Sequence, residues 1–321
     1  MLETETVLDR RRLRRSLTLW RGAGIAALAL AAGLLIFGGD KLASLSGQKQ
    51  IARIAIEGTI TEDRDQLKML KDITEAEHVQ GVILYVNSPG GTTTGGEALF
   101  GALRKLAEKK PLVAQFGTVA APAGYIVGLS SDHIVARGNT ITGSVGVIVQ
   151  WPELNQLLDK LGVKVNEVKS GPLKATPSPF EPLTEEGRQI AQGMVTEGFK
   201  WFLGLVESRR GIKGADIPGL TEGRIFSGRE ALAAKLVDEI GGEDEAVKWL
   251  QDVKNVDKNA KVIDWKPSAG SGFGPFGMAS RVLGAVLGKA TGEITQIVMR
   301  DRSISTLGLD GLVSVWHPSD K

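Results

Sequence analysis

From residue 50 onward, apolar and polar positions follow two patterns that alternate along the chain and predict strands and helices. Short runs rich in β-branched residues predict strands at 51–56, 81–86, 112–116, 133–136 and 145–149. Stretches with apolar residues every three or four positions predict helices at 65–76, 95–108, 125–130 and 152–161. Strands that are apolar throughout and separated by helices are typical of a mainly parallel sheet covered on both faces. The pattern therefore predicts an α/β domain over residues 50–265.

The second half of this domain is predicted to be mostly helical. A long helix at 184–209 follows a loop broken by prolines, and two shorter helices are expected at 228–240 and 243–250. The apolar face of the long helix is formed by Phe199, Phe202, Leu203 and Val206. We expect the domain to end near Trp265.

Residues 268–321 change in composition. The stretch 268–277, SAGSGFGPFG, has the glycine, serine and proline content of a linker. Apolar residues near helical spacing then predict an amphipathic tail over 278–321. That tail would pack on its own subunit or on a neighbouring one, and attachment to a membrane surface is the alternative.

The N-terminus has the pattern of a membrane anchor. Residues 22–39 carry no charge, and at 1.5 Å per residue a helix of this length spans about 27 Å. Residues 1–21 carry six arginines against three acidic residues, which predicts that they stay in the cytoplasm while the bulk of the chain lies outside. We therefore expect a single-pass protein of the inner (cell) membrane. A cleaved signal peptide and a buried core helix remain as alternatives.

Composition excludes several classes of protein. With no cysteine, the chain has neither a disulfide framework nor thiol catalysis nor Cys-ligated metal. A net charge of +2 with 5% aromatic residues gives no indication of nucleic-acid binding. No phosphate-binding loop, dinucleotide fingerprint or metalloprotease motif is present, so we expect no cofactor and no metal. Glycine is abundant, with 41 residues.

Four small-residue segments are candidates for the chemistry. They are NSPGG at 87–91, GTVAAPAGY at 117–125, NTITGSVGV at 139–147 and KSGPLK at 169–174. The first two follow predicted strands and lead into predicted helices. Glycines at such junctions let the backbone approach a substrate and expose N–H groups to a developing oxyanion. Each segment alone is a weak signal.

Together, in the order VNSPGG, VAAPAGY, SDHIVA, TITGSVGVI, KSGPLK and GRIFSGREALAAKLVDEIGG, these segments resemble the signal peptide peptidase A family. The resemblance covers about residues 50–250 and the N-terminal anchor. It implies a crotonase-like, Clp-protease-like α/β fold, a membrane-anchored serine peptidase that cuts remnant signal peptides, and a ring-shaped homo-oligomer. Apolar peptides and the membrane are the implied partners.

The resemblance also assigns roles to residues. Lys174 takes the position of the family's lysine general base, Ser144 that of the serine that orients the lysine, and Gly91 that of an oxyanion-hole glycine. The position of the serine nucleophile is held by Pro122. Proline has no hydroxyl for a lysine to deprotonate and no N–H to offer an oxyanion. The chain as given is therefore expected to be catalytically impaired.

No other side chain is an obvious substitute for the serine. Ser88 fits the role of a turn former, and Thr118 lies at a strand end. Ser130 and Ser131 lie about two helical turns past residue 122. Three histidines, His78, His133 and His317, are scattered, and adjacency of His133 to Asp132 does not orient a base.

Three hypotheses about the function remain. The chain is a peptidase with a local substitution at residue 122, since serine and proline codons can differ by one base. Alternatively, it is a non-catalytic protein that holds peptides or assembles with active paralogues, in which case Lys174 could serve the serine of another chain in a mixed ring. In the third reading it is a scaffold that acts through its oligomer alone.

Overall fold

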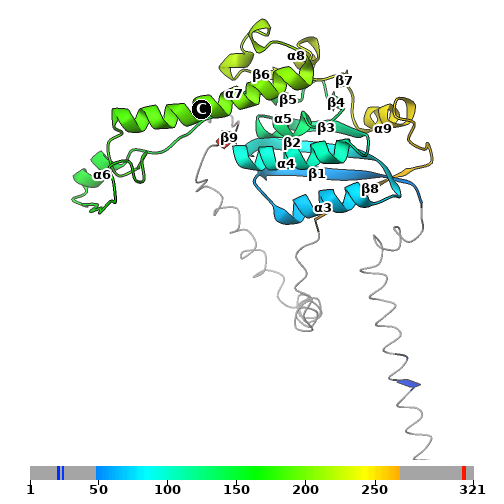
Figure 1. Ribbon diagram of the computed structural model, residues 1–321, viewed down its shortest axis with the longest axis horizontal. Coiled ribbons are helices and arrows are strands. Elements are labelled where there is room, and N and C mark those ends of the chain that lie inside the picture. Colours follow the sequence, from blue (N-terminus) through cyan, green and yellow to red (C-terminus); the bar gives the residue numbers. More distant parts are fainter. Residues whose placement is uncertain (1–19, 22–23, 25–47, 268–312, 316–321) are drawn as a thin grey trace, which may run out of the picture. The chain divides into compact units, whose positions relative to one another are not determined.

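One mainly parallel sheet organises the protein, and nine strands of the described residues take part in it (Figure 1). The computed structural model describes residues 20, 21, 24, 48–267 and 313–315. The chain divides into two units at Lys49, and the second unit carries the sheet. The strands are β1 (Gln50–Ile60), β2 (Val79–Thr92), β3 (Leu112–Ala120), β4 (His133–Ala136), β5 (Ile141–Gly143), β6 (Ile225–Ser227), β7 (Glu239–Ile240), β8 (Lys261–Trp265) and β9 (Val313–Val315).

The strand order is β6-β5-β3-β2-β1-β8, with β4 beside the first half of β3 and β7 beside β4. All pairs are parallel except β5 with β6 and β2 with β9. Strand β3 pairs with β4 through Val113–Phe116 and with β5 through Val119 and Ala120. The strand beside β3 therefore changes from β4 to β5 toward the carboxyl end of β3, where the candidate site lies.

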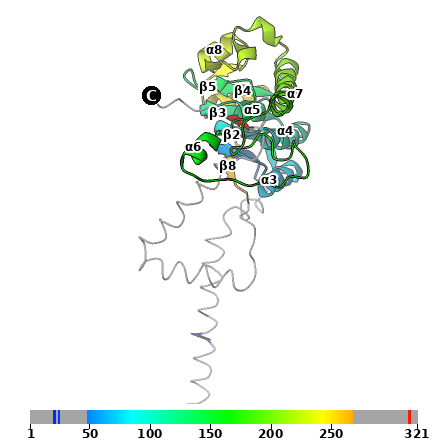
Figure 2. The same cartoon turned by 90° about the vertical axis from the view of Figure 1, so that its left-hand side faces the viewer.

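Helices connect the strands and cover the sheet. They are α3 (Arg64–Glu75), α4 (Thr93–Ala107), α5 (Ala123–Gly128), α6 (Asn155–Lys160), α7 (Glu185–Arg210), α8 (Gly228–Ala233) and α9 (Glu243–Asp252), with two short 3-10 turns, η1 (Gly214–Asp216) and η2 (Leu220–Glu222). Figure 2 shows α3, α4 and α7 on the same side of the sheet. Side-chain caps define two helix starts: Asp63 accepts from two amides of α3, and Thr184 accepts from the Gly187 amide of α7.

The buried strand residues alternate between two apolar clusters. Ile83, Val113 and Val135 pack with Leu250 of α9, whereas their neighbours in sequence face α3, α4 and α5. Successive side chains of a strand point to opposite faces, so a strand buried on both faces must be apolar throughout. The prediction of a mainly parallel sheet with both faces covered is confirmed, while the finer likeness to Clp protease stays a prediction.

Two predicted elements are wrong. A strand was expected at 145–149, but the strand is Ile141–Gly143, because positive φ angles at Gly143 (81°) and Ser144 (51°) end it. A helix was expected at 228–240, but α8 ends at Ala233, and Glu239–Ile240 forms β7 beside β4. Strands β6 and β8 were not predicted.

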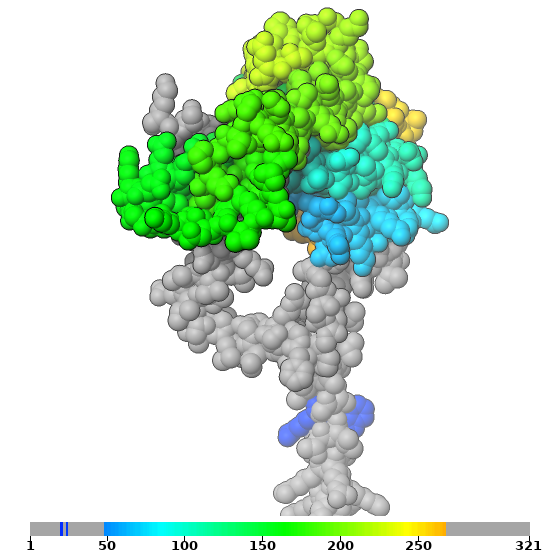
Figure 3. Space-filling model, turned by 60° about the vertical axis from the view of Figure 1, so that its left-hand side comes forward, coloured from blue at the N-terminus to red at the C-terminus, as the bar shows by residue number. Residues whose placement is uncertain are grey.

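Residues 148–194 form a projection that we call the arm. It contains α6, the loop that follows it and the N-terminal part of α7, and it extends to one side of the sheet (Figures 1 and 3). Among the residues that the structure describes, fifteen large apolar side chains are exposed, and ten of them lie in the arm: Ile148, Leu157, Leu161, Val163, Val165, Val168, Leu173, Phe180, Ile190 and Met194. The arm and the body around the sheet therefore differ sharply in burial.

Some expectations fall on residues that the structure does not describe. Apart from Gly24, the anchor expected at 22–39 lies outside the described residues, and no helix within them is long and apolar enough to cross a membrane. The linker at 268–277 lies outside them too, as does the tail at 278–321 apart from Val313–Val315.

Candidate active site

The expected oxyanion segment is the last part of β2. The sequence predicted a strand that ends at residue 86, with 87–91 as its junction to a helix, but the strand continues to Thr92. The buried Ser88 hydroxyl accepts from the Gly90 amide and donates to the Gly90 carbonyl, both at 3.1 Å. A Cβ on Gly91 would lie 1.9 Å from the carbonyl oxygen of Ile60 on β1. The close approach of the two strands therefore requires glycine at 91.

The chain turns from β3 into α5 at Pro122. The Ala121 amide still bonds the Ser88 carbonyl at 3.2 Å, and Pro122 then stands at the N-cap of α5 with φ −62° and ψ −43°. Proline's ring holds φ near −65°, and the first turn of a helix does not use that N–H. Pro122 therefore fits this buried elbow without backbone strain.

Ser144 reaches the same region from the loop after β5. Its φ of 51° is left-handed, and its amide donates to the Arg224 carbonyl at 2.9 Å. Gly143 precedes it with φ 81°, where a Cβ would meet Phe226 at 2.7 Å. These constraints, from Arg224 just before β6 and from Phe226 on β6, hold Ser144 in an uncommon backbone conformation.

Pro122 and Ser144 line one cavity of about 470 Å³, which we call the elbow cavity. Its other walls are the loop after Ser144, one face of α7 and η2. The lining residues are Pro122, Ser144, Val145, Gly146, Val147, Ile148, Gln192, Val195, Thr196, Phe199, Thr221, Glu222 and Gly223. The structure thus brings two of the four predicted positions into one cavity.

Sequence reasoning missed most of the cavity wall. Gln192, Val195, Thr196 and Phe199 follow the i, i+3, i+4, i+7 spacing of one helix face. Only Phe199 was singled out, and then as a core residue. The helical spacing of these four residues could have revealed them, because it extends one face of α7 beyond the part of the helix that is buried.

Lys174 lies elsewhere, on the arm. Its side chain is exposed, its amide donates to the Gly171 carbonyl at 3.1 Å, and it does not line the elbow cavity. Nearby, Lys169 bridges Glu167 and Glu181, and these carboxylates raise the pKa of the Lys169 ammonium. The structure of a single chain therefore separates the predicted base from the predicted nucleophile position.

The substitute hydroxyls have structural partners. Ser130 and Ser131 are buried and donate to the carbonyls of Val127 and Gly128, each at 2.6 Å. Ser88 is held by Gly90, as described above. Thr118 is exposed on β3 and does not line the elbow cavity.

The two histidines that the structure describes, His78 and His133, do not line the elbow cavity. His133 stacks on Trp249 at 4.9 Å, and its Nε2 lies 3.1 Å from Glu239. Asp132 instead accepts from the Leu112 amide at 3.3 Å. His78 stacks on Trp265, and His317 lies outside the described residues. Within the described chain, no cluster of three or more possible metal ligands is present.

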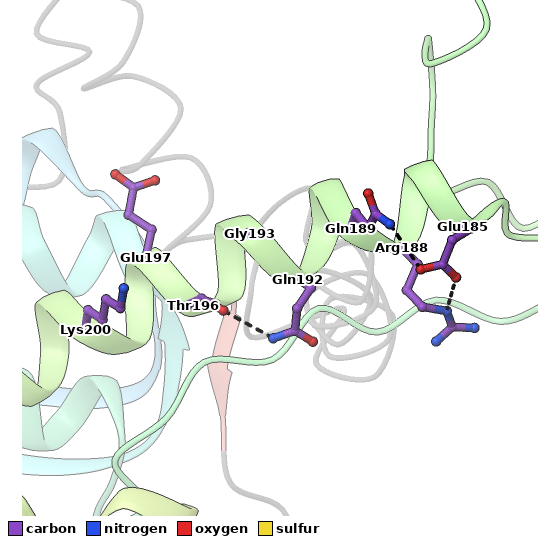
Figure 4. A pocket seen from close by; sticks show the side chains of 8 residues that line it. All are labelled: Glu185, Arg188, Gln189, Gln192, Gly193, Thr196, Glu197 and Lys200. Carbon is purple, nitrogen blue, oxygen red and sulfur yellow. Dashed lines mark hydrogen bonds and ion pairs between the residues drawn. The ribbon is translucent and has the colours of Figure 1, made fainter.

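A second hollow of about 560 Å³ runs along α7 (Figure 4). Every side chain that lines it comes from this helix, and two of them are joined at 3.3 Å by the bond from Gln192 Nε2 to Thr196 Oγ1. No group from another element converges on it. It shares Gln192 and Thr196 with the elbow cavity, so we interpret it as an open extension of that cavity.

Hydrogen bonds join the elements behind the elbow. Tyr125 of α5 is fully buried, and its hydroxyl donates to the Leu236 carbonyl at 2.8 Å. Burial raises the pKa of this phenol, so it stays neutral. Arg209 of α7 donates to the carbonyls of Leu129 and Ser131, both at 2.8 Å, and so ties α7 to the end of α5.

Comparison with known proteins identifies the family. The profile of Peptidase family S49 matches residues 104–257. A protein described as a protease from Synechocystis is 34% identical over 221 residues, 68% of this chain and 79% of that relative. A protein described as signal peptide peptidase SppA from Enterococcus faecium is 32% identical over 251 residues, 74% of this chain and 72% of that relative. The chain belongs to the signal peptide peptidase A family of peptidase family S49.

A longer relative agrees with this assignment. Protease 4 of Haemophilus influenzae is 30% identical over 236 residues, which are 70% of this chain and 38% of that protein. The expected family is thereby confirmed, and the comparisons support a serine-protease type of function. The roles of individual residues in this member remain predictions.

Proposed function

We propose that this member of the signal peptide peptidase A family binds apolar peptides, such as cleaved signal peptides, and that Pro122 disables their hydrolysis. The observation that carries the proposal is the position of Pro122, at the N-cap of α5 and in the lining of the elbow cavity together with Ser144. A hydroxyl there would project from a sharp strand-to-helix turn, the usual setting of a nucleophile in α/β hydrolases. The scaffold supports a peptidase, and the reactive atom is missing.

In the proposed chemistry a serine at 122 would lose its proton to a neutral lysine and attack the peptide carbonyl. The Gly91 amide would stabilise the resulting oxyanion. Proline supplies neither the oxygen nor a second N–H donor. Loss of a nucleophile costs factors of about 10⁶ in kcat in serine peptidases, and only the residual catalysis from binding and the oxyanion hole is left.

The exposed position of Lys174 fits a site that is completed by a neighbour. A lysine acts as a general base near neutral pH when burial lowers its pKa. Lys174 is exposed in one chain, and it lies on an arm with many exposed apolar side chains. We propose that the arm packs on a second copy within a homo-oligomeric ring, where Lys174 approaches the elbow of that copy.

The test compares the parent chain with Pro122→Ser, and with Pro122→Ser combined with Lys174→Ala, on a quenched apolar reporter peptide. We expect cleavage by Pro122→Ser only, and loss of that cleavage in the double variant. Lys160→Ala in the same Pro122→Ser background is the control, because Lys160 ends α6 on the same arm and has no proposed role. Cleavage by the parent at the rate of Pro122→Ser contradicts the proposal.

The peptide-binding and scaffold hypotheses predict other outcomes of the same experiment. If Pro122→Ser and the parent both fail to cleave but bind the reporter, the chain is a peptide-binding module. If neither binds, the exposed apolar side chains of the arm favour an oligomeric scaffold.

We further propose that residues 22–39 anchor the protein in the inner membrane, with residues 1–21 in the cytoplasm and the domain outside. A reporter enzyme that is active only outside the cytoplasm, fused after Lys321, should be active. Activity of a cytoplasm-only reporter at the same position contradicts this topology.

A further inference from the structure

The elbow cavity combines an apolar lining with a single carboxylate. Among the described residues that line it, Glu222 of η2 is the only one with a charged side chain. The apolar part of the lining comes from the loop after Ser144 and from α7, and consists of Val145, Val147, Ile148, Val195 and Phe199. At about 470 Å³ the cavity can hold a side chain of a bound peptide. Such a side chain would meet apolar contacts and one negative charge.

The backbone that carries Glu222 is held on both sides. The turn η2 lies between Gly219 and Gly223, whose φ angles of 81° and 78° are left-handed. The Arg224 amide donates to the Gly219 carbonyl at 3.0 Å and closes the turn. The Arg224 carbonyl in turn accepts from the Ser144 amide at 2.9 Å. The backbone of Glu222 therefore keeps a defined position relative to Ser144.

The charge of Glu222 is not neutralised by a neighbour within the described chain, where no cation forms an ion pair with its carboxylate. The nearest cation in the sequence, Arg224, instead bonds Glu230 at 2.6 Å and lies over the Phe226 ring at 4.9 Å from its centre. The Glu222 side chain is exposed, so a new partner can reach it without removing all of its hydration. This carboxylate is therefore open to a cation from outside the chain.

The α7 wall of the cavity adds a hydrogen-bond acceptor. Gln192 Nε2 donates to Thr196 Oγ1 at 3.3 Å, as the dashed line in Figure 4 shows. Because the amide nitrogen of Gln192 serves as the donor, its amide oxygen can accept a further hydrogen bond. The ammonium of lysine and the guanidinium of arginine carry only donors, on a stem that packs well against apolar surface. A lysine or arginine side chain thus matches both the polar and the apolar parts of the cavity.

We propose that Glu222 selects peptides that place a lysine or arginine side chain in the elbow cavity, next to apolar residues. This inference rests on the proposed peptide-binding function and narrows the class of peptide. Cleaved signal peptides have this composition, because a positively charged segment precedes their apolar run. A peptide with an acidic residue at the same position is disfavoured by repulsion between the two carboxylates.

Binding of three matched peptides tests the selection. Fluorescein-labelled peptides of sequence Ala-Leu-Ala-Leu-X-Ala-Leu-Ala, in which X is lysine, norleucine or glutamate, are titrated against the full chain by fluorescence anisotropy. Norleucine keeps an apolar stem and lacks the charge. The parent should bind the lysine peptide with a Kd about twofold to fivefold lower than that of the norleucine peptide, as for a partly exposed charge pair. Added salt should reduce this difference.

Substitutions separate the charge of Glu222 from the net charge of the protein. Glu222→Gln should make the Kd values of the lysine and norleucine peptides equal, and Glu222→Lys should make the glutamate peptide bind more tightly than the lysine peptide. Glu108→Gln is the matched control, because Glu108 is exposed at the C-cap of α4 and lines neither the elbow cavity nor the hollow along α7. It should keep the parent's ratio of Kd values. The norleucine peptide should bind every variant alike, which shows that the cavity is intact.

The outcomes distinguish this inference from the proposed function. Equal Kd values of the lysine and norleucine peptides on the parent overturn the selection and leave peptide binding intact. So does a ratio that Glu222→Gln leaves unchanged, or that Glu108→Gln changes as much. If none of the three peptides binds the parent, the proposed function fails, and the selection by Glu222 is overturned with it.

Discussion

Helix α7 passes through two different environments, and the contrast explains the candidate site. Its C-terminal half packs Phe202 and Val206 into the body with no exposed surface. Its N-terminal half lies in the arm, where Ile190 and Met194 are 41% and 49% exposed. The elbow cavity lies where the two halves meet.

The proposed catalytic positions divide in the same way. Gly91, Pro122 and Ser144 belong to strands and turns whose backbone is fixed by neighbours, such as the Ile60 carbonyl against Gly91. Lys174 belongs to the exposed arm. Packing within one chain thus fixes the proposed oxyanion and nucleophile positions, whereas the proposed base needs a contact that one chain does not supply.

The largest effect on stability is expected at Gly91, where the backbones of β1 and β2 meet. Gly91→Ala would place a Cβ against the Ile60 carbonyl and force β1 and β2 apart, at a cost on the order of 5 kcal/mol. For a marginally stable domain this prevents folding, which circular dichroism and solubility would show. Gly101→Ala on the exposed face of α4 is the control, with no atom within 4 Å of its new Cβ, and it should stabilise slightly. A folded Gly91→Ala with unchanged stability contradicts the close approach of the strands.

The two halves of α7 can be compared directly. Phe202→Ala should lower the free energy of unfolding by about 3–5 kcal/mol, because it leaves a cavity in the core. Met194→Ala in the arm should change the free energy of unfolding by less than about 0.5 kcal/mol. Urea unfolding of both variants measures the difference. Similar losses would show that the arm is as well packed as the body.

The proposed oligomer sharpens the same contrast. Val168, fully exposed on the arm, and Val253, 57% exposed after α9, offer a matched pair for charge introduction. Val168→Glu should lower the mass measured by light scattering toward that of the monomer, since a carboxylate cannot be buried at an apolar interface without a large penalty. Val253→Glu should leave the mass unchanged. An equal effect of both, or of neither, argues against the arm as the interface.

The smallest effect on stability is expected at the ion pair between Arg53 of β1 and Asp264 of β8. Hydrogen bonding from Arg53, at 2.5 Å, lowers the pKa of the Asp264 carboxyl below its usual value. A lowered pKa in the folded state gives stability that is present above the unfolded pKa, about 3.9, and is lost as pH falls through the folded one. Because both side chains are partly exposed, Asp264→Asn should cost less than about 1 kcal/mol at pH 7. Thermal unfolding at pH 7 and pH 3 checks that the difference shrinks in acid.

The parts that could be predicted from sequence depend on local pattern. Apolar strands such as 81–86 are buried on both faces, and α7 begins at its Thr184 cap, one residue from the expected start. The strand expected at 145–149 failed because positive φ at Gly143 and Ser144, set by contacts with β6, overrides the β-branched pattern. Pairing over long range, as between β9 and β2, leaves no periodic signal in the sequence.

The same distinction applies to the site. Pro122, Ser144 and Gly91 could be placed by family resemblance, and two of them share a cavity. The face of α7 that completes the cavity shows in the sequence only as a helical spacing, and the surfaces that it meets, η2 and the loop after β5, come from tertiary packing. The exposure of Lys174 depends on how far the arm extends from the sheet, which no local pattern encodes.

The central claim is that residue 122 alone separates this scaffold from a serine peptidase. Its most direct test is covalent labelling with a fluorophosphonate, which reacts only with activated serine hydroxyls, followed by intact-mass measurement. Pro122→Ser should gain one label, located by peptide mapping at residue 122, and Lys174→Ala in that background should abolish the labelling. The parent should gain none. Labelling of the parent, or a folded Pro122→Ser that remains unlabelled, would contradict the account.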